Sequence, residues 1–170
     1  MYINSIKFKN FKIFTKDEFT FDKINFVKGS NGSGKSTLVL DSLLFGLYGF
    51  TTKERLSDLP TRDKSKSCTV EINLNYNKSI YIIRREYPTK LQIKKDKEWM
   101  DFKTSKEAQN FIDETFGDRT SFQKFRLIDA YNKEANFLEE GQTTLKKIIF
   151  SLSDELFNNI RNRELKIGSV

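Results

Sequence analysis

Apolar and polar residues alternate through the first part of the chain, as they do in half-buried β-strands. The extended segment near the N-terminus carries its apolar residues at Ile3, Ile6, Phe8 and Phe11. Phe19-Thr20-Phe21 alternates as well, and the apolar run at residues 24–27, Ile-Asn-Phe-Val, leads directly to Gly29. We therefore predict strands within about the first 28 residues, with a short buried strand at residues 24–27.

The next predicted element is a helix that begins at Lys35. Leucines occupy nearly every face of this helix, at Leu38, Leu40, Leu43, Leu44 and Leu47. A helix that is apolar nearly all round is a buried helix. Gly46 weakens it and Gly49 is placed to end it, because glycine is a poor helix former and is common just beyond a helix.

The middle of the chain predicts a polar loop followed by a hairpin. Residues 51–66 are polar and contain Pro60, which indicates a loop. Residues 68–76 alternate strictly, Asn77-Lys78 is placed to form a turn, and residues 80–85 form the returning strand. Residues 90–97 are expected to add a third strand that ends near Trp99.

Helices are predicted in the C-terminal part. Thr104 with Glu107 three residues later is a capping box, so a helix is predicted from Thr104 to Phe116, with Gly117 at its end. A further helix is expected to start near Thr143 or Thr144. Its apolar stripe would consist of Leu145, Ile148, Ile149 and Leu152. From Asp154 onward the pattern stays helical, although it is too short to establish a coiled coil.

Composition then excludes several kinds of chemistry. The 170 residues suffice for one domain, and they include no histidine and a single cysteine, Cys68. Histidine-based catalytic triads and His-ligated zinc are therefore excluded, and no cysteine cluster offers a metal site. The N-terminus lacks the apolar stretch of a signal peptide, and no run approaches the ~18 apolar residues of a membrane span. We expect a soluble intracellular protein, either cytoplasmic or associated with the nucleoid.

The net charge of +7 leaves two interpretations open. One is a solvated basic surface, and the other is a polyanionic partner in addition to a nucleotide. Composition alone does not decide between them.

One motif carries specific chemistry. Residues 29–36, Gly-Ser-Asn-Gly-Ser-Gly-Lys-Ser, match the G-x-x-x-x-G-K-[ST] pattern of a P-loop, between a predicted strand and a predicted helix. Its glycines let backbone N–H groups turn toward phosphate oxygens, and the helix adds the positive end of its dipole. Lys35 suits the β and γ phosphates of a nucleoside triphosphate, Thr37 the α phosphate, and the Ser36 hydroxyl Mg²⁺. The predicted phosphate-binding residues are Ser30, Asn31, Gly32, Ser33, Gly34, Lys35, Ser36 and Thr37.

The residues needed for hydrolysis are not found in the sequence. An ATPase of this kind needs an apolar strand that ends in a carboxylate supporting Mg²⁺. The nearest segment is residues 125–129, Phe-Arg-Leu-Ile-Asp, and Arg126 interrupts its apolar run. No Leu-Ser-Gly-Gly signature is present either. We therefore predict the phosphate-binding half of an ATPase, with no catalytic residue in this chain.

These motifs resemble the N-terminal ATPase lobe of SMC-like proteins (structural maintenance of chromosomes). The similarity is closer to the SbcC-type double-strand-break repair ATPases and the large subunits of phage recombination exonucleases. It begins with residues 6–12, Ile-Lys-Phe-Lys-Asn-Phe-Lys, and continues through residues 21–29 before the P-loop. The helix that ends in Leu-Phe-Gly-Leu-Tyr-Gly at Gly49 is similar too, and residues 145–165 resemble helices that lead into a coiled coil.

The resemblance implies an α/β P-loop NTPase head of the ABC/SMC type, with a mixed β-sheet around the P-loop helix. The N-terminal ATPase lobe would span residues 1–152, and residues 153–167 would start the helix that leads to the coiled coil. Residues 168–170 would be a linker or a cloning scar.

The resemblance also implies cofactors and partners: ATP, Mg²⁺, a C-terminal ATPase lobe, a second ATPase head, a nuclease subunit and double-stranded DNA. Two heads would sandwich ATP, and hydrolysis would need the C-terminal lobe. No membrane is implied, and a phage-encoded protein would act in the host cytoplasm.

Further site residues follow from the same resemblance. Lys12, with Ile13 or Phe14, would lie near the nucleotide, although a plain surface lysine is the alternative. Arg62 is added to the nucleotide-binding residues. A glutamine that ligates Mg²⁺ in the family is replaced here by Tyr131 or Asn132, so Asn132 would join Ser36 as a metal ligand.

Basic residues of the loop at 51–66 and of the hairpin at 80–97 are expected to include a DNA-backbone contact surface. They are Arg55, Arg62, Lys64, Lys66, Arg84, Arg85, Lys94, Lys95 and Lys97. Two other functions stay open: the head of a RecF-like or anti-phage-defence ATPase, and a non-catalytic scaffold that has kept a P-loop.

Overall fold

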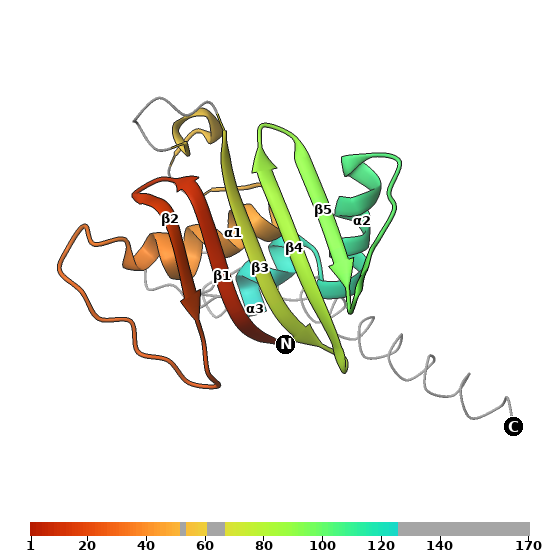
Figure 1. Cartoon of the computed structure of the whole chain (residues 1–170), viewed down its shortest axis with the longest axis horizontal. Helices are drawn as coiled ribbons and strands as arrows, with labels where there is room; N and C mark the ends of the chain where they lie inside the picture. The colour runs from red at the N-terminus through yellow and green to blue at the C-terminus, as the bar shows by residue number, and fades with distance from the viewer. Residues whose placement is uncertain (52–53, 61–66, 126–170) are drawn as a thin grey trace, which may run out of the picture. The chain divides into compact units, whose positions relative to one another are not determined.

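Strands and helices follow one another in an order close to that predicted from the sequence. The computed structural model describes residues 1–51, 54–60 and 67–125 (Figure 1). Its strands are β1 (Tyr2–Phe11), β2 (Phe14–Thr20), β3 (Cys68–Tyr76), β4 (Ser79–Tyr87), β5 (Lys90–Lys95) and β6 (Glu98–Trp99). Its helices are η1 (Thr37–Asp41), α1 (Ser42–Tyr48), η2 (Leu56–Asp58), α2 (Ser105–Phe116) and α3 (Arg119–Phe125). Met1–Phe122 forms one compact unit, and the description below concerns that unit.

The strands form a single sheet in the order β2-β1-β3-β4-β5-β6, and every neighbouring pair is antiparallel (Figure 1). The predicted hairpin is confirmed, because β3 and β4 pair from Cys68↔Tyr87 to Tyr76↔Ser79. Asn77 and Lys78 connect them with φ angles of 47° and 67°. Positive φ at both residues is what a two-residue hairpin turn needs to match the twist of its strands.

The predicted buried strand at residues 24–27 is wrong. This segment belongs to no strand, and its side chains lie in solvent, with Ile24 80% and Phe26 96% exposed. An apolar strand is buried only when a neighbouring strand pairs with its backbone and a second layer covers its side chains. Among the described residues, no strand lies beside this segment.

The predicted helix from Lys35 to Gly49 is confirmed, with one irregularity. Helical residues begin at Lys35, pass through the π-helical turn η1, and continue as α1. In the π turn the backbone N–H of Ser42 donates to the carbonyl of Thr37, five residues earlier. Gly49 ends the helix in the left-handed conformation, with φ 62°.

Helix α1 packs on one face of the sheet (Figure 1), and its residues from Ser42 to Leu47 are buried. At Gly46 an added Cβ would lie 2.4 Å from Cδ1 of Ile72 on β3, so glycine allows the close approach. Aromatic rings fill the space between helix and sheet at the β2 edge. Phe8 stacks on Phe14 with ring centroids 4.6 Å apart, and Phe11 stacks on Phe45 of α1 at 5.4 Å.

The capping box of α2 is confirmed. The Thr104 side chain accepts a hydrogen bond from the backbone N–H of Glu107 at 3.2 Å, and the Glu107 carboxylate accepts one from the N–H of Lys103 at 3.0 Å. Helix α3 was not predicted. Its first turn is held by Asp118, whose carboxylate accepts from the N–H of Ser121 at 2.7 Å.

Predictions for the C-terminal part lie outside the described residues. They include the helices expected from Thr143 and from Asp154, and the division of the chain at residues 152 and 167. The described helices contain none that is long and apolar enough to cross a membrane.

Candidate phosphate-binding site

The loop from Gly29 to Gly34 lies at the start of the helix that begins at Lys35. Inside the loop, the N–H of Ser33 donates to the carbonyl of Ser30 at 3.2 Å. The ammonium of Lys35 folds back and donates to the carbonyl oxygens of Gly29 at 2.8 Å and Ser30 at 2.7 Å. The predicted loop and its lysine are therefore brought together, with the lysine held at the mouth of the loop.

The loop has donors to offer to an anion. The backbone N–H groups of Asn31, Gly32 and Gly34 find no acceptor among the described residues, and these residues are exposed or half-buried. Phosphate oxygens bind in concave nests of such N–H groups at a helix N-terminus. Lys35 needs only to exchange two carbonyl oxygens for phosphate oxygens, which form the stronger, charge-assisted hydrogen bonds.

Ser36 and Thr37 follow in the first helical turn, on the solvent side. Ser36 is exposed and Thr37 half-buried. Within the described part of the chain, the Ser36 hydroxyl makes no hydrogen bond that would have to break before it ligates a cation. Its hard oxygen suits Mg²⁺. The described residues hold no cluster of three or more Cys, Asp or Glu side chains able to bind a metal by themselves.

The β1–β2 turn packs directly against the loop. An added Cβ at Gly34 would lie 2.2 Å from Cδ1 of Ile13 and 3.1 Å from the ring of Phe14. Gly34 also has φ 86°, a conformation that residues with a Cβ rarely adopt. The backbone conformation favours glycine at this position. The contact with Ile13 adds a smaller penalty, because Ile13 is 53% exposed and the tip of its side chain can turn aside.

Lys12 belongs to the same turn and is not a plain surface lysine. Its ammonium lies 2.5 Å from the carboxylate of Asp41 and 3.3 Å from that of Glu54, and its side chain is only 10% exposed. Asp41 was missed in the sequence, where it stands as the one acidic residue in an apolar helix. An acidic residue among leucines is a signal for a buried ion pair, because an unpaired buried carboxylate is costly.

Two predicted site residues, Arg62 and Asn132, lie outside the described residues. The same holds for Tyr131 and for Asp129, the nearest match to a catalytic carboxylate.

Arg85, one of the basic residues expected to include a DNA-contact surface, is engaged inside the protein unit instead. Its half-buried guanidinium lies on the α1 side of the sheet, where it donates to the carbonyls of Gly46 and Leu47 and to the side-chain oxygen of Gln109. Burial lowers the pKa of Arg85 to about 10, and the nearby charge of Asp113 partly opposes that shift. The neighbouring Arg84 lies on the opposite face, paired with Glu71 at 2.5 Å. Strand alternation separates the two arginines.

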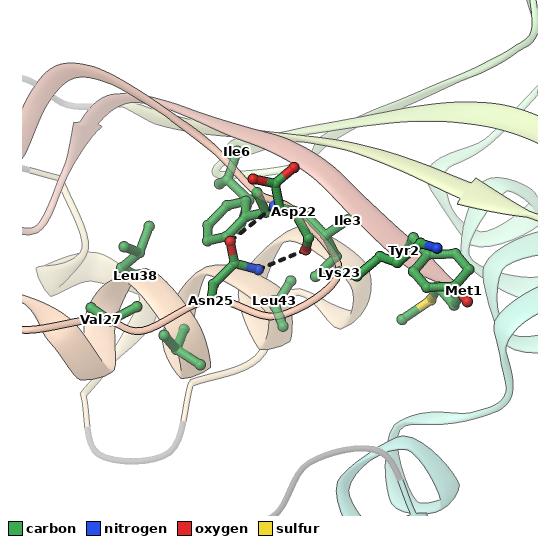
Figure 2. Close-up of a pocket in the computed structure, with 12 residues that line it drawn as sticks. Met1, Tyr2, Ile3, Ile6, Asp22, Lys23, Asn25, Val27, Leu38 and Leu43 are labelled. Carbon is green, nitrogen blue, oxygen red and sulfur yellow. Dashed lines mark hydrogen bonds between the residues drawn. The ribbon is translucent and has the colours of Figure 1, made fainter.

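A shallow apolar cavity of about 310 Å³ lies beneath the exposed segment at residues 21–27. Figure 2 shows Ile6, Leu38 and Leu43 among the residues that line it, together with Asn25, which is hydrogen-bonded to Asp22. The cavity lies beside the apolar face of the P-loop helix, and none of the phosphate-binding residues lines it.

Comparison with known proteins gives the class of the fold. A chain solved in work on the structural biochemistry of ATP-driven dimerization and DNA-stimulated activation of SMC ATPases is similar over 89% of this chain and 99% of its own. The two chains are 20% identical, with a TM-score of 0.62. Structures of the recombination mediator protein RecF with ATP and with ATPrS match at TM-scores of 0.48 and 0.46, and the match spans only 28% and 29% of their chains. No curated protein matches the chain.

The fold, with the sheet, the P-loop and the buried helix in this order, is that of a P-loop NTPase head of the SMC type. The chain belongs to the AAA domain family, whose model matches residues 5–167.

Proposed function

We propose that this chain is the ATP-binding N-terminal lobe of an SMC-like ATPase that acts in DNA double-strand-break repair or recombination. One observation carries the nucleotide-binding part of the proposal. A glycine loop with three available backbone N–H groups surrounds the ammonium of Lys35 at the start of a buried helix. This arrangement binds phosphates by its backbone, independently of any catalytic residue.

Mg²⁺ would be held by the Ser36 hydroxyl and would offset the charge of the β and γ phosphates. The second ligand would be Asn132. The carboxylate that activates water would come from a C-terminal lobe, because the sequence shows no apolar strand that ends cleanly in a carboxylate.

The exposed segment at residues 22–28 supports a C-terminal lobe as a partner. Its backbone pairs with no strand among the described residues, and Phe26 is almost fully exposed. The neighbours of Phe26, Asn25 and Val27, line the apolar cavity of Figure 2. An exposed segment with apolar side chains whose backbone is paired with no strand invites a neighbouring strand. A C-terminal lobe that supplies this strand would cover the apolar residues and bring its catalytic residues to the phosphates. The SMC chain of similar extent, whose study concerns ATP-driven dimerization, makes a second head a natural further partner.

Double-stranded DNA and a nuclease subunit complete the proposal. The exposed lysines of the β5–β6 hairpin, Lys95 and Lys97, remain available for the DNA backbone, as does the exposed Arg55. If this surface binds DNA, affinity in the assembled head should fall steeply with salt, and Lys95→Glu with Lys97→Glu should flatten that slope. If the salt dependence of DNA affinity is the same in this variant as in wild type, the β5–β6 hairpin does not contact DNA.

The test of nucleotide binding is a titration of the chain with fluorescent mant-ATP and Mg²⁺. Wild type should bind, and Lys35→Ala should weaken binding by about 10- to 100-fold, the loss expected for charge-assisted hydrogen bonds. Circular dichroism should show an unchanged fold. Equal mant-ATP affinities of wild type and Lys35→Ala would contradict the proposed phosphate-binding function.

A further inference from the structure

We infer that Lys12 is a positioning residue whose ion pair with Asp41 holds the β1–β2 turn against the P-loop and so keeps the loop in its phosphate-binding shape. The inference rests on the proposed nucleotide binding and concerns residues outside the P-loop itself. It assigns Lys12 a role through Asp41, in place of a direct contact with the nucleotide.

The ion pair joins two elements that meet on either side of the loop. Lys12 and Ile13 are the two residues that connect β1 to β2, because Phe11 pairs with Phe14. Asp41 ends the π turn of the helix that starts at Lys35. The ammonium and carboxylate are 2.5 Å apart, and both side chains are nearly buried, at 10% and 9% exposed. A charge-assisted contact sheltered from solvent is stronger than the same contact at the surface.

The turn is anchored by its backbone as well. The N–H of Lys12 donates to the carbonyl of Leu59 at 2.7 Å, and Leu59 is fully buried. Lys12 has φ 53°, in the left-handed region that lysine avoids. A residue persists in that conformation only where its surroundings over-determine it, and here one hydrogen bond and two carboxylates do so.

The residues that follow Lys12 in the turn connect the ion pair to the P-loop, because they lie against Gly34. The tip of the Ile13 side chain and the nearly buried ring of Phe14 both lie where they would meet a Cβ at Gly34, so a shift of the turn changes the packing against Gly34. Gly34 in turn offers a free N–H and, through its carbonyl, accepts from Leu38 at 2.8 Å in the first helical turn. Loosening the Lys12–Asp41 pair should therefore loosen the anion-binding loop.

A direct contact of Lys12 with phosphate would require the ammonium to leave both carboxylates. That exchange would leave Asp41 buried without a cation, in a cluster that already contains two carboxylates and one ammonium. An unpaired buried charge is costly, so the geometry favours the positioning role.

A double-mutant cycle on the whole chain separates the two roles. Mant-ATP affinity and thermal unfolding would be measured for wild type, Lys12→Met, Asp41→Asn and the double variant. We expect each single variant to bind about tenfold more weakly, as for one lost hydrogen bond of ordinary strength. The double variant should also bind mant-ATP about tenfold more weakly than wild type, and not about a hundredfold more weakly. Both substitutions break the same contact, so their effects on affinity should not add. Lys12→Arg, which keeps the positive charge, should bind mant-ATP with nearly the affinity of wild type.

The matched control is a second ion pair, which links β1 to β2. Lys7 and Glu18 lie 3.1 Å apart with half-exposed side chains on the solvent face of β1 and β2. Lys7→Met should leave mant-ATP affinity unchanged. If Lys12→Met does not fold, Asp41→Asn, which keeps the shape of the side chain and removes its charge, carries the test.

Two results would overturn the inference while leaving the proposed function intact. In the first, Lys12→Met weakens binding and Asp41→Asn leaves it equal or tighter, which shows a direct contact of Lys12 with nucleotide. In the second, folded variants of both residues bind as wild type does. Failure of wild type to bind mant-ATP would instead overturn the proposed function, and the inference with it.

Discussion

The guanidinium of Arg85 on β4 donates a hydrogen bond of 2.9 Å to the carbonyl of Leu47, in the last turn of the P-loop helix. A second bond of 3.1 Å reaches the carbonyl of Gly46. The last carbonyls of a helix have no partner within the helix, so Arg85 supplies one from the sheet. A third bond to Gln109 ties α2 to the same group. Arg85 thus joins β4, α1 and α2 at the end of the helix far from the phosphates.

Replacing this residue should destabilise the whole unit. We predict that Arg85→Met lowers the free energy of unfolding by about 2–3 kcal/mol, because two helix carbonyls and the Gln109 side chain lose a buried partner. The matched control is Arg84→Met, which removes a partly exposed ion pair and should cost below about 1 kcal/mol. Urea unfolding measures both. Equal losses for the two variants would contradict the role given to Arg85.

Gly34 should tolerate a side chain less well than Gly32. Both have positive φ, so alanine costs about 1–2 kcal/mol of backbone strain at either position. Only at Gly34 does the new Cβ also meet Ile13, whereas nothing lies within 4 Å of a Cβ at Gly32. Gly34→Ala should therefore weaken mant-ATP binding more than Gly32→Ala, and adding Ile13→Ala should recover part of the loss. Indistinguishable affinities for the two alanine variants would argue against the contact.

Cys68 should make the stability of the protein sensitive to alkaline pH. Burial raises the pKa of its thiol from 9.0 to about 12; a hydrogen bond with the Tyr87 backbone partly opposes the shift, and the charge of Glu86 adds a smaller rise. Between these values the unfolded chain loses the thiol proton and the folded chain keeps it. The unfolded state then binds fewer protons, so stability falls as pH rises, by up to ~1.4 kcal/mol per pH unit from this group.

Cys68→Ala removes this term and leaves every other titrating group in place. The free energy of unfolding, measured under reducing conditions from neutral pH to about pH 10.5, should therefore fall less steeply for the variant than for wild type. Parallel curves would show that the thiol does not titrate differently in the two states.

The exposed Phe26 offers a test of the proposed second lobe. We predict turnover well below ~1 s⁻¹ for this chain alone, the lower end for competent phosphoryl-transfer enzymes. A C-terminal lobe supplied as a separate chain should raise it. Phe26→Asp should bind mant-ATP as wild type does and lose that stimulation, because a charge would enter the covered apolar face. Ile80→Asp, at a half-exposed position on β4, is the control and should be stimulated normally.

Local patterns were sufficient for much of the fold. The hairpin of β3 and β4, the capping box of α2 and the glycine that ends α1 were all predictable, because each depends on residues a few positions apart. The phosphate-binding loop was predictable for the same reason, since its chemistry lies in consecutive backbone groups. Helix α3 was missed because its only strong local signal is Asp118, one capping residue ahead of a short helix.

What the amino-acid sequence determined by itself was therefore the P-loop, the alternation of the strands and the buried character of the P-loop helix. Only the tertiary structure decided that Lys12 pairs with Asp41, that Ile13 and Phe14 lie against Gly34, and that Arg85 bonds the end of α1 while Arg84 pairs with Glu71. These contacts join residues from different elements, whose spacing along the chain carries no mark of their distance in space. The apolar run at residues 24–27 is a case in which the local pattern gave the wrong prediction. Its composition predicts burial, but burial needs a neighbouring strand, and within the described residues none is present.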